Sequence, residues 1–361
     1  MVMFLSAIVN GLGVEWSLGE AVKFVVSRQF PAFIAAGIAQ GTAVLVYRLT
    51  RQATDARRLG SYQLESLLGS GGMGEVWRAR HRLLVRPAAI KLIRREALGK
   101  DDDARRAVLR RFEREAQATA LLKSPHTVAL YDFGVTDDGR FYYVMELLEG
   151  LDLKRLVERN GPVPQERALH ILQQVCHSLA DAHDAGLVHR DVKPANVFLG
   201  QRGADHDFVK VLDFGLVMHP RLDEAERTRP TGPGPVTGTP AFMAPELIQG
   251  RDVDARADLY GVGCVAYWLL TGALVFEGKS PREMMAKHIG EPPLPPSARS
   301  ELPISSDVDT VILRCLAKQP QDRPPDARRL IHELAACAAA SEPWTRERAN
   351  AWWDTHRPAL A

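Results

Sequence analysis

Two acids, a cation and an amide lie close together in His189–Asn196 (HRDVKPAN) and in Asp213–Gly215 (DFG). Transfer of a γ-phosphoryl group requires an acid that orients the attacking hydroxyl, and oxygen ligands for a metal that neutralises charge on the phosphate. Asp191 suits the first task, and Asp213 with Asn196 suits the second. Either tripeptide alone would indicate only a capped turn or a solvated ion pair. Their order and spacing together favour phosphoryl-transfer chemistry.

Two short apolar strands are expected to position these groups, at Val197–Leu199 and at Val209–Leu212. The stretch Gly200–Asp207 between them has the composition of a turn. A hairpin of this kind would carry Asn196 and Asp213 back to the same place. Three polar groups would then converge on one metal–phosphate centre.

These motifs resemble those of the eukaryotic-like serine/threonine protein kinases of bacteria, over about residues 62–335. The resemblance implies that Asp191 is the catalytic base and that Lys193 contacts the transferring phosphate. It also implies that Asn196 and Asp213 hold Mg²⁺, with Mn²⁺ as an alternative, and that the phosphate donor is ATP. Lys193 is the residue that separates the serine/threonine type of loop from the tyrosine type.

A glycine-rich stretch, Leu68–Val76, separates two expected strands at residues 62–68 and 75–81. Because glycines lack Cβ atoms, backbone N–H groups in such a turn can approach phosphates closely. This pattern alone is weak, since dinucleotide-binding folds carry a similar one. Those folds need a helix directly after the third glycine, whereas Val76–Arg80 alternates as a strand does. The kinase-type hairpin is therefore favoured over a nicotinamide site.

The apolar run Ala88–Ile93 holds a single lysine, Lys91. A charge is costly there unless it is paired, and Glu115 is the expected partner. Glu115 lies in residues 107–122, where apolar side chains repeat at three and four positions as in a helix. The resemblance implies that Lys91 binds the α- and β-phosphates and that Glu115 holds it in the active state. The alternative is that Lys91 is a solvated strand residue.

A further strand, Phe141–Glu146, runs into a stretch that resembles the hinge between two lobes. Adenine requires apolar faces and backbone hydrogen bonds at its edge. By the resemblance, Met145 is the gatekeeper, and the main chain near Glu146 and Leu148 bonds the base. From the residues alone, each of these is better explained as a core residue. The nucleotide contacts that the resemblance implies are Gly69, Ser70, Gly71, Gly74, Val76, Ala89, Lys91, Met145, Glu146, Leu148 and Phe198.

About thirty residues between Asp213 and Ala244–Glu246 are rich in Pro, Gly, Thr and Arg, a composition that buries too little apolar surface to order itself. This suits an activation loop, although a plain linker is the alternative. Its hydroxyl candidates are Thr228, Thr231, Thr237 and Thr239. We expect phosphorylation at Thr231 first and Thr228 second, and by the resemblance Arg190 pairs with the phosphorylated loop.

Three more charged residues correspond, by the resemblance, to charged residues in the larger lobe of the family's fold. Glu246 and Arg323 are expected to form a buried ion pair, which fixes geometry more than it adds stability. Asp258 begins an apolar helix that runs through Leu270. It is explained either as a helix-start acid or, by the resemblance, as the acid that braces the catalytic loop, and both can hold.

Length and composition support a cytosolic globular core. The chain has 361 residues, more than one typical domain, and a net charge of +2 from 46 basic and 44 acidic residues, so nothing calls for nucleic acid. Its four cysteines, Cys176, Cys264, Cys315 and Cys337, are dispersed and indicate reduced core thiols.

Residues 1–60 differ in kind from the rest. The run 30–47 has no formal charge and would cover about 27 Å as a helix, nearly the roughly 30 Å of a bilayer core. Arginines follow it, which favours a cytoplasmic location for what comes next, and so an inner-membrane protein with a cytoplasmic catalytic domain. A buried or interfacial helix, and with it a cytoplasmic protein, is the alternative. Residues 1–14 lack a positive n-region, so a cleaved signal peptide is not expected.

The sequence therefore predicts an α+β, bilobal protein-kinase fold: a small β-rich lobe of five strands with one helix at residues 61–146, and a larger, mainly helical lobe at 150–337. The apolar segment 1–60 precedes it, and a short tail, 338–361, follows. Three tryptophans in that tail, Trp344, Trp352 and Trp353, are expected to pack on the domain rather than bind a partner. The predicted activity is ATP-dependent phosphorylation of protein serines and threonines in signal transduction, with autophosphorylation and, by resemblance, homodimerisation. The rivals are a pseudokinase and a membrane-tethered platform that binds nucleotide without turnover.

Overall fold

The computed structural model describes residues 58–71, 74–94, 102–136, 138–214 and 240–356, together with Gly19 and Lys23. The predicted apolar run 30–47 and the proposed activation-loop threonines lie outside these residues. Within the described part of the chain, none of the helices is long and apolar enough to span a bilayer.

Contacts divide the chain into two compact units, one of residues 1–65 with 80–85 and the other of residues 66–79 with 86–361. In the first unit, the two-residue strand β1 (Arg58–Leu59) pairs antiparallel with the start of β2, so that Leu59 lies opposite Tyr62. Both of these side chains are buried.

The larger sheet has six strands in the order β1-β2-β3-β4-β6-β5, one more than predicted because of the short β1. Its other strands are β2 (Tyr62–Ser70), β3 (Gly74–His81), β4 (Pro87–Ile93), β5 (Leu130–Val135) and β6 (Phe141–Glu146). β4 and β6 pair antiparallel with Ala89 opposite Met145 and Lys91 opposite Tyr143. This register places Lys91 and Tyr143 side by side on one face of the sheet.

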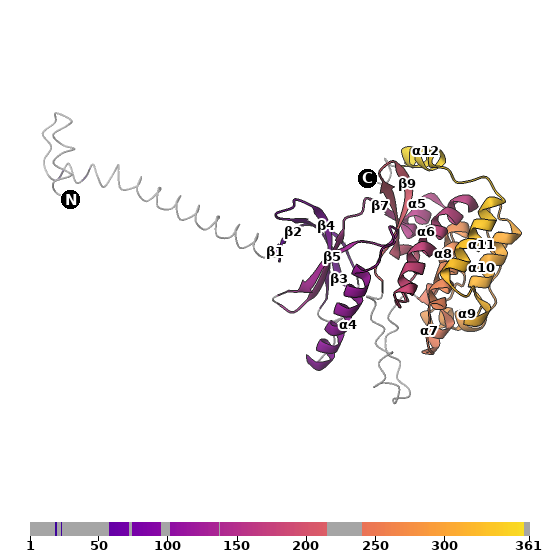
Figure 1. Cartoon of the computed structure of the whole chain (residues 1–361), viewed down its shortest axis with the longest axis horizontal. Helices are drawn as coiled ribbons and strands as arrows, with labels where there is room; N and C mark the ends of the chain where they lie inside the picture. Colours follow the sequence, from indigo (N-terminus) through magenta and orange to yellow (C-terminus); the bar gives the residue numbers. More distant parts are fainter. Residues whose placement is uncertain are drawn as a thin grey trace. The chain divides into compact units, whose positions relative to one another are not determined.

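One long helix, α4 (Asp102–Ala120), packs against this sheet, as Figure 1 shows beside β3 and β5. Its Phe112 and Ala116 are buried in a cluster with Phe141 and Tyr143 of β6. The Phe112 and Phe141 rings stack with their centroids 5.0 Å apart. The helix predicted over 107–122 is therefore confirmed, with its start five residues earlier.

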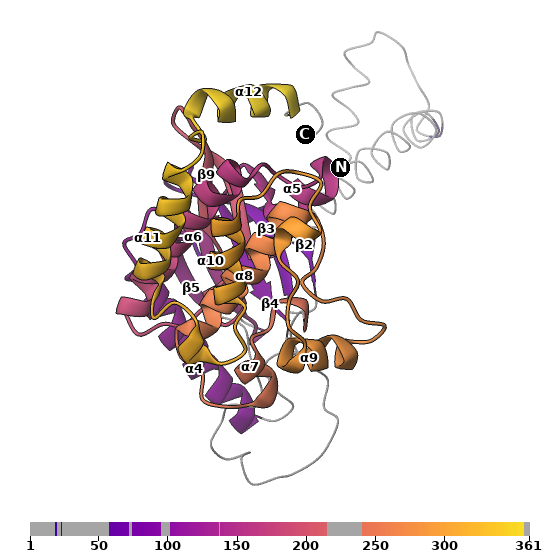
Figure 2. The same ribbon diagram turned by 90° about the vertical axis from the view of Figure 1, so that its right-hand side faces the viewer.

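The remaining elements are mainly helical and surround a second, larger core. The helices are α5 (Leu153–Asn160), α6 (Gln165–Asp184), α7 (Pro245–Gln249), α8 (Arg256–Thr271), α9 (Pro281–Gly290), α10 (Ser306–Cys315), α11 (Ala327–Ala339) and α12 (Arg346–His356). A three-stranded sheet in the order β7-β8-β9 is formed by Gly150–Asp152, Val197–Arg202 and Asp205–Val211. Figure 2 shows α6, α8, α10 and α11 gathered together, with α12 over β9. The predicted α+β fold is confirmed.

Helix α8 lies at the centre of this core because its residues are apolar on almost every side, and it is buried from Ala257 to Tyr267. Glycine at position 261 allows a close approach: a Cβ there would lie 2.8 Å from Cβ of Val192. The loop that contains Asp191 therefore rests directly on this helix. The four cysteines are free and buried, as predicted.

Candidate active site

The β8–β9 hairpin brings two of the predicted site residues together. β8 begins directly after Asn196, and β9 ends two residues before Asp213, with Val197 opposite Val211. The backbone N–H of Leu212 donates to the carbonyl of Asn196 at 2.9 Å, which closes the hairpin at this end. The convergence expected from the two apolar strands is confirmed.

Asp191, Lys193 and Asn196 form one hydrogen-bonded cluster. Nζ of Lys193 lies 2.6 Å from Oδ2 of Asp191. The amide Nδ2 of Asn196 donates to the same Oδ2 and to the Asp191 carbonyl, each at 2.9 Å. Because the amide nitrogen faces Asp191, the amide oxygen of Asn196, which accepts no hydrogen bond from the described residues, is left as a potential metal ligand.

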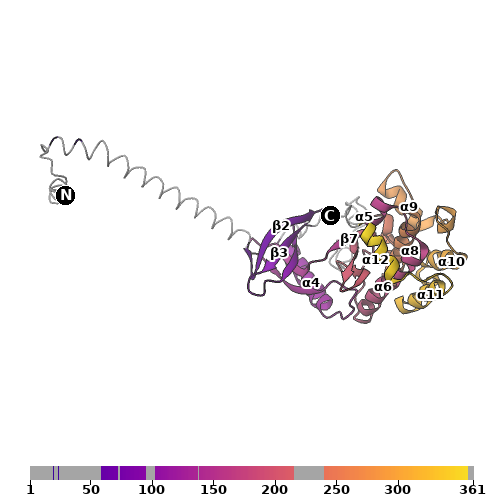
Figure 3. The ribbon, with the colours of Figure 1, turned by 90° about the horizontal axis from the view of Figure 1, so that it is seen from above.

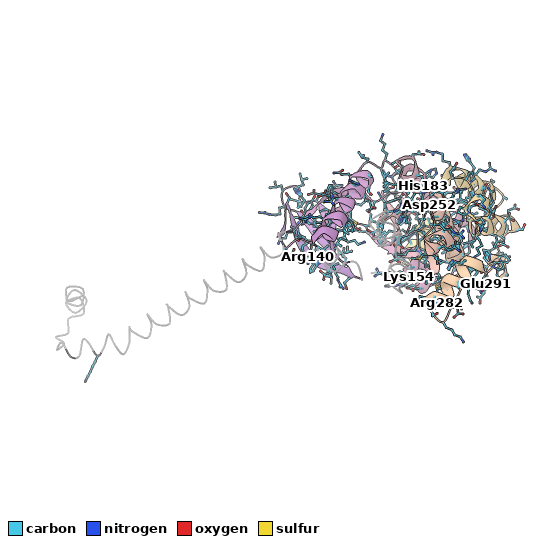
Figure 4. The ribbon with its side chains drawn as sticks, turned by 90° about the horizontal axis from the view of Figure 1, so that it is seen from below. Arg140, Lys154, His183, Asp252, Arg282 and Glu291 are labelled. Carbon is cyan, nitrogen blue, oxygen red and sulfur yellow. The ribbon has the colours of Figure 1, made fainter. Side chains whose placement is uncertain are left out.

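The backbone before Asp191 is held by the buried carboxylate of Asp258 from α8. This carboxylate accepts hydrogen bonds from the N–H groups of His189, at 2.8 Å, and Arg190, at 2.7 Å. Its Oδ2 is also 2.8 Å from Nε2 of His183, which Figure 4 labels. Arg190 has a left-handed φ of 63°, a costly conformation for a residue with a side chain. Asp258 thus both stands in the first turn of α8 and braces the loop.

His189 connects this loop to the segment that holds Asp213. Its ring is 2.8 Å from the carbonyl of Leu212 through Nε2. It also packs on the buried ring of Phe214, with the centroids 4.7 Å apart. Asp213 itself has a φ of 59°. The two motifs are therefore tied together by contacts on both sides of Asp213.

Asp213 is the acceptor for two donors from the larger sheet. Nζ of Lys91 is 2.6 Å from its Oδ2, and the hydroxyl of Tyr143 donates to its Oδ1 at 2.5 Å. Burial opposes ionisation of Asp213, but the nearby Lys91 charge and these hydrogen bonds outweigh it and lower its pKa. Burial, followed by the Asp213 charge, raises the pKa of Tyr143 well above its usual value, so the phenol stays protonated and donates.

Sequence reasoning missed Tyr143. The available signal was its register: two residues before Met145 on a strand paired with β4, it lies opposite Lys91. Glu115 lies half-buried on α4, and Lys91 contacts Asp213. The Lys91–Glu115 pair stays a prediction.

The residues predicted to contact the nucleotide lie on β2, β3, β4, β6 and β8 and in the segments directly after β2 and β6. Ala89 and Met145 are buried in one apolar cluster, and Val76 packs against it. Glu146 and Phe198, together with Leu148, line a cavity of about 380 Å³ beside the hinge. The Glu146 carboxylate is 2.6 Å from Nζ of Lys210, and its Oε1 accepts a hydrogen bond from the N–H of Ala129 at 2.7 Å. Val76, Ala89 and Met145 do not line this cavity, and adenine binding by the whole set stays a prediction.

The glycine-rich turn joins β2 to β3. Gly69, Ser70 and Gly71 are exposed, and the Gly71 N–H donates to the Gly74 carbonyl at 2.9 Å. A Cβ on Gly74 would lie 2.0 Å from the carbonyl oxygen of Leu92, so only glycine fits there. The hairpin predicted in place of a strand–helix turn is confirmed.

Glu246 and Arg323 form the predicted buried ion pair. The Arg323 guanidinium is bidentate on the carboxylate, at 2.6 and 2.8 Å. It also donates to the carbonyls of Ala317 and Arg256, at 2.8 and 2.9 Å, so the charge is well solvated by protein groups. The pair ties the start of α7 to the segment before α11.

The C-terminal tryptophans pack on the domain, as predicted, and they do so around a second buried ion pair. Arg167 of α6 is bidentate on Asp207 of β9, with both distances 2.8 Å. The indole N–H groups of Trp344 and Trp353 donate to the two oxygens of the same carboxylate, at 2.8 and 2.7 Å. The Arg167 guanidinium lies 3.8 Å above the ring of Trp352. Figure 3 shows α12 lying over this part of the domain, between α5 and α6.

The donor set fits Mg²⁺ bound together with a polyphosphate. Mg²⁺ takes oxygen ligands, and it usually binds through one or two carboxylates plus substrate phosphates rather than a protein cage. The ionised Asp213 and the amide oxygen of Asn196 supply such ligands. Among the described residues, no group of three or more His, Cys, Asp or Glu side chains is placed to hold a metal ion.

Comparisons with known proteins agree with this geometry. Residues 62–337 match the family model described as the protein kinase domain. The chain is 40% identical over 278 residues to the serine/threonine-protein kinase pkn3 of Myxococcus xanthus, covering 76% of this chain and 49% of that protein. It is 41% identical over 265 residues to the serine/threonine-protein kinase PknB of Mycobacterium tuberculosis, covering 73% of this chain and 40% of that protein. The chain thus spans about half, or less, of these curated relatives.

Among solved structures, the PknI kinase domain of Mycobacterium tuberculosis is similar in fold. The crystal structure of its C20A_R136A double mutant superposes with a TM-score of 0.61 at 29% identity, covering 78% of this chain and 97% of that one. The kinase domain without these substitutions gives a TM-score of 0.59 at 28% identity, with 77% and 96% covered.

Proposed function

The chain belongs to the protein kinase family, and on this premise we propose that it transfers the γ-phosphate of MgATP to serine and threonine hydroxyls of proteins. The observation that carries the proposal is the arrangement around Asp213: the Lys91 ammonium lies on one of its oxygens, while the Asn196 amide sits at the base of the same hairpin. A scaffold without catalysis would have no need of an intact Asp191, Lys193 and Asn196 cluster.

Asp191 orients the attacking hydroxyl. Its carboxylate is fixed by Lys193 and Asn196 and its backbone by Asp258, so its position is set before a substrate arrives. It accepts the hydroxyl proton as the bond from the hydroxyl oxygen to the γ-phosphorus forms and the bond from that phosphorus to the β–γ bridging oxygen breaks, which releases ADP. Lys193, whose ammonium is already at the acid, stabilises negative charge on the transferring group.

Asp213 and Asn196 would hold Mg²⁺, which would supply positive charge to neutralise the phosphates. Lys91 is placed to exchange part of its contact with Asp213 for the α- and β-phosphates. Backbone N–H groups of the glycine-rich turn between β2 and β3 would contact the phosphates. Mn²⁺, which accepts the same oxygen ligands, would substitute.

We further propose that activity is controlled by phosphorylation at Thr231 or Thr228. The support lies in Arg190: its Nε is buried and has no hydrogen-bond partner among the described residues. A guanidinium with an unsatisfied N–H group favours a phosphate as its partner. Signalling at the cytoplasmic face of the inner membrane, through the apolar run 30–47, and homodimerisation belong to the same proposal. The membrane part rests on the composition of that run and on the arginines after it.

Mass spectrometry of the full chain tests regulation and activity together. The chain is first treated with phosphatase, which is then removed, and it is incubated with MgATP beside an identically treated Asp191→Asn variant. We expect phosphate on Thr231 or Thr228 only in the parent protein. Phosphate on neither protein, with ATP still bound, would instead support a nucleotide-binding platform.

A further inference from the structure

The turn between β3 and β4 exposes three consecutive large apolar side chains. Leu83, Leu84 and Val85 have 86%, 72% and 63% of their surface exposed. Single exposed apolar residues are ordinary, whereas a contiguous group at the end of a hairpin marks a surface that another apolar phase covers. We call Leu83–Val85 the apolar tip. None of the chemistry proposed above uses it.

The tip is held in a defined conformation. Nδ1 of His81 accepts hydrogen bonds from the N–H groups of Leu83, at 3.3 Å, and Leu84, at 3.0 Å. The Val85 N–H donates to the His81 carbonyl at 2.9 Å, and the edge of Tyr62 packs on the His81 ring at 4.9 Å. Val85 has a φ of 53°, which is a strained conformation for a β-branched residue. The fold thus maintains the display of apolar side chains at a cost in backbone strain.

Basic residues precede the tip. Arg80 and Arg82 are both exposed, and Figure 3 labels β3, the strand that leads into the turn. Arg80 lies 3.4 Å from Glu65, but both side chains are largely solvated, so this pair holds the guanidinium only weakly. The Arg82 N–H donates to the Ser61 carbonyl at 2.9 Å, which fixes the backbone while the side chain is exposed.

This combination favours a lipid surface over a protein partner. The cores of protein interfaces are depleted in charge, and leucine is under-represented among residues that dominate binding there. At the surface of an anionic membrane, guanidinium groups can bind the headgroups while neighbouring leucine and valine side chains contact the acyl chains. Arginine side chains can also keep their charged ends at the phosphates while the tip enters more deeply.

We propose that the apolar tip inserts into the headgroup region of an anionic membrane, with Arg80 and Arg82 on the lipid phosphates. The chain that precedes β1 makes the location reachable. Ten residues separate Tyr47, the last of the uncharged run, from Arg58 at the start of β1. Fully extended, they span at most about 40 Å. The inference goes beyond the kinase activity, and it holds whether or not residues 30–47 cross the bilayer.

A fluorescent probe on the tip tests this proposal in the full chain. The four native cysteines are buried, whereas Leu84 is exposed. A Leu84→Cys substitution therefore introduces an exposed thiol, which is labelled with the environment-sensitive dye NBD. Vesicles of phosphatidylcholine with one-third phosphatidylglycerol are expected to raise and blue-shift its emission, and nitroxide-labelled lipids to quench it. Arg80→Gln and Arg82→Gln should each raise the lipid concentration at half-maximal signal about fivefold.

Leu294→Cys provides the matched control, because Leu294 is an exposed leucine, 53% accessible, without arginine on either side. Vesicles should leave its dye unchanged. No change at position 84, or equal changes at both positions, would overturn the proposal. A change at position 84 that depends on protein concentration and needs no vesicles would overturn it in favour of a second copy of the chain. Transfer of phosphate to a peptide by the same labelled protein would show that the kinase proposal survives either result.

Discussion

At the scale of single residues, the site is a set of acids whose charge is prepared before nucleotide and metal bind. Asp213 is buried, yet its pKa is lowered because Lys91 and Tyr143 act on its two oxygens. Asp191 is held by Lys193 and Asn196 in the same way. Asp213 is therefore ionised, and both carboxylates are oriented before their ligands bind, which reduces the reorganisation required during transfer.

The Tyr143→Phe substitution tests whether the phenol positions Asp213. It removes one hydroxyl and keeps the ring that packs beside Phe112 and Phe141. Partners that hydrogen-bond a metal-binding carboxylate typically contribute tenfold or more to metal affinity. We expect the Mg²⁺ concentration that gives half-maximal binding of a fluorescent ADP analogue to rise about tenfold. Binding of the analogue without metal should change little.

Tyr142→Phe is the control for this experiment, since it removes a hydroxyl from the neighbouring position of the same strand, which points to the opposite face of the sheet. Its Mg²⁺ dependence should match the parent protein. Equal Mg²⁺ dependence in all three proteins would mean that Tyr143 has no positioning role.

At the scale of elements, two supports converge on the β8–β9 hairpin. Helix α8 braces the loop before it through Asp258 and through the close contact between Gly261 and Val192. The tail braces β9 at Asp207, whose carboxylate accepts four N–H groups, two from Arg167 and two from indoles. A buried ion pair is favourable only when its remaining hydrogen-bonding groups have partners. Here the indole N–H groups of the tail are the additional donors to Asp207.

The Trp353→Phe substitution should therefore destabilise the domain. It removes an N–H donor and leaves one oxygen of a buried carboxylate less satisfied, at a cost of about 1–3 kcal/mol. Trp352→Phe should cost less, because Trp352 stacks on Arg167 without donating to Asp207. The free energy of unfolding in urea measures both. Equal values for the two variants would contradict a special role for the indole N–H of Trp353.

Sequence reasoning predicted the elements, and the hairpin that brings Asn196 and Asp213 together, where a local pattern indicated them. The strands around the glycine turn and the hairpin after Asn196 follow from alternation and turn residues, and α8 follows from an unbroken apolar run. The contacts of Tyr143 and Asp207 could not be predicted, because each depends on side chains far apart in sequence. The contact between Lys91 and Asp213 could not be predicted for the same reason. The apolar run around Lys91 indicates only that its charge needs an acidic partner, and Asp213 lies 122 residues away in the sequence.

At the scale of the whole molecule, the net charge of +2 leaves stability to depend on individual buried groups rather than on general repulsion. His288 is one such group. Nδ1 of His288 is 2.7 Å from the Tyr260 hydroxyl, and its ring packs against Phe276. Burial first, and then the nearby Lys318 charge, lower its pKa to about 4.

This shift makes stability fall in mild acid. The unfolded chain, with an ordinary histidine pKa of about 6.5, binds the proton more readily than the folded chain, so stability decreases as the pH falls from about 6.5 towards 4. From pH 7 to pH 5 the loss from His288 should be about 2 kcal/mol. Urea unfolding at the two values measures it. In His288→Gln the difference between the two pH values should shrink by that amount, and an unchanged difference would exclude His288 as its source.

The most direct test of the proposed activity is phosphoryl transfer itself. The full chain is incubated with radiolabelled MgATP and a generic serine/threonine protein substrate, beside Asp191→Asn, and the labelled substrate is hydrolysed to its amino acids. Because the proposal assigns the acceptance of the hydroxyl proton to Asp191, we predict labelled phosphoserine and phosphothreonine from the parent and a rate at least 10²-fold lower from the variant. Equal labelling by both proteins, or label confined to phosphotyrosine, would contradict the account.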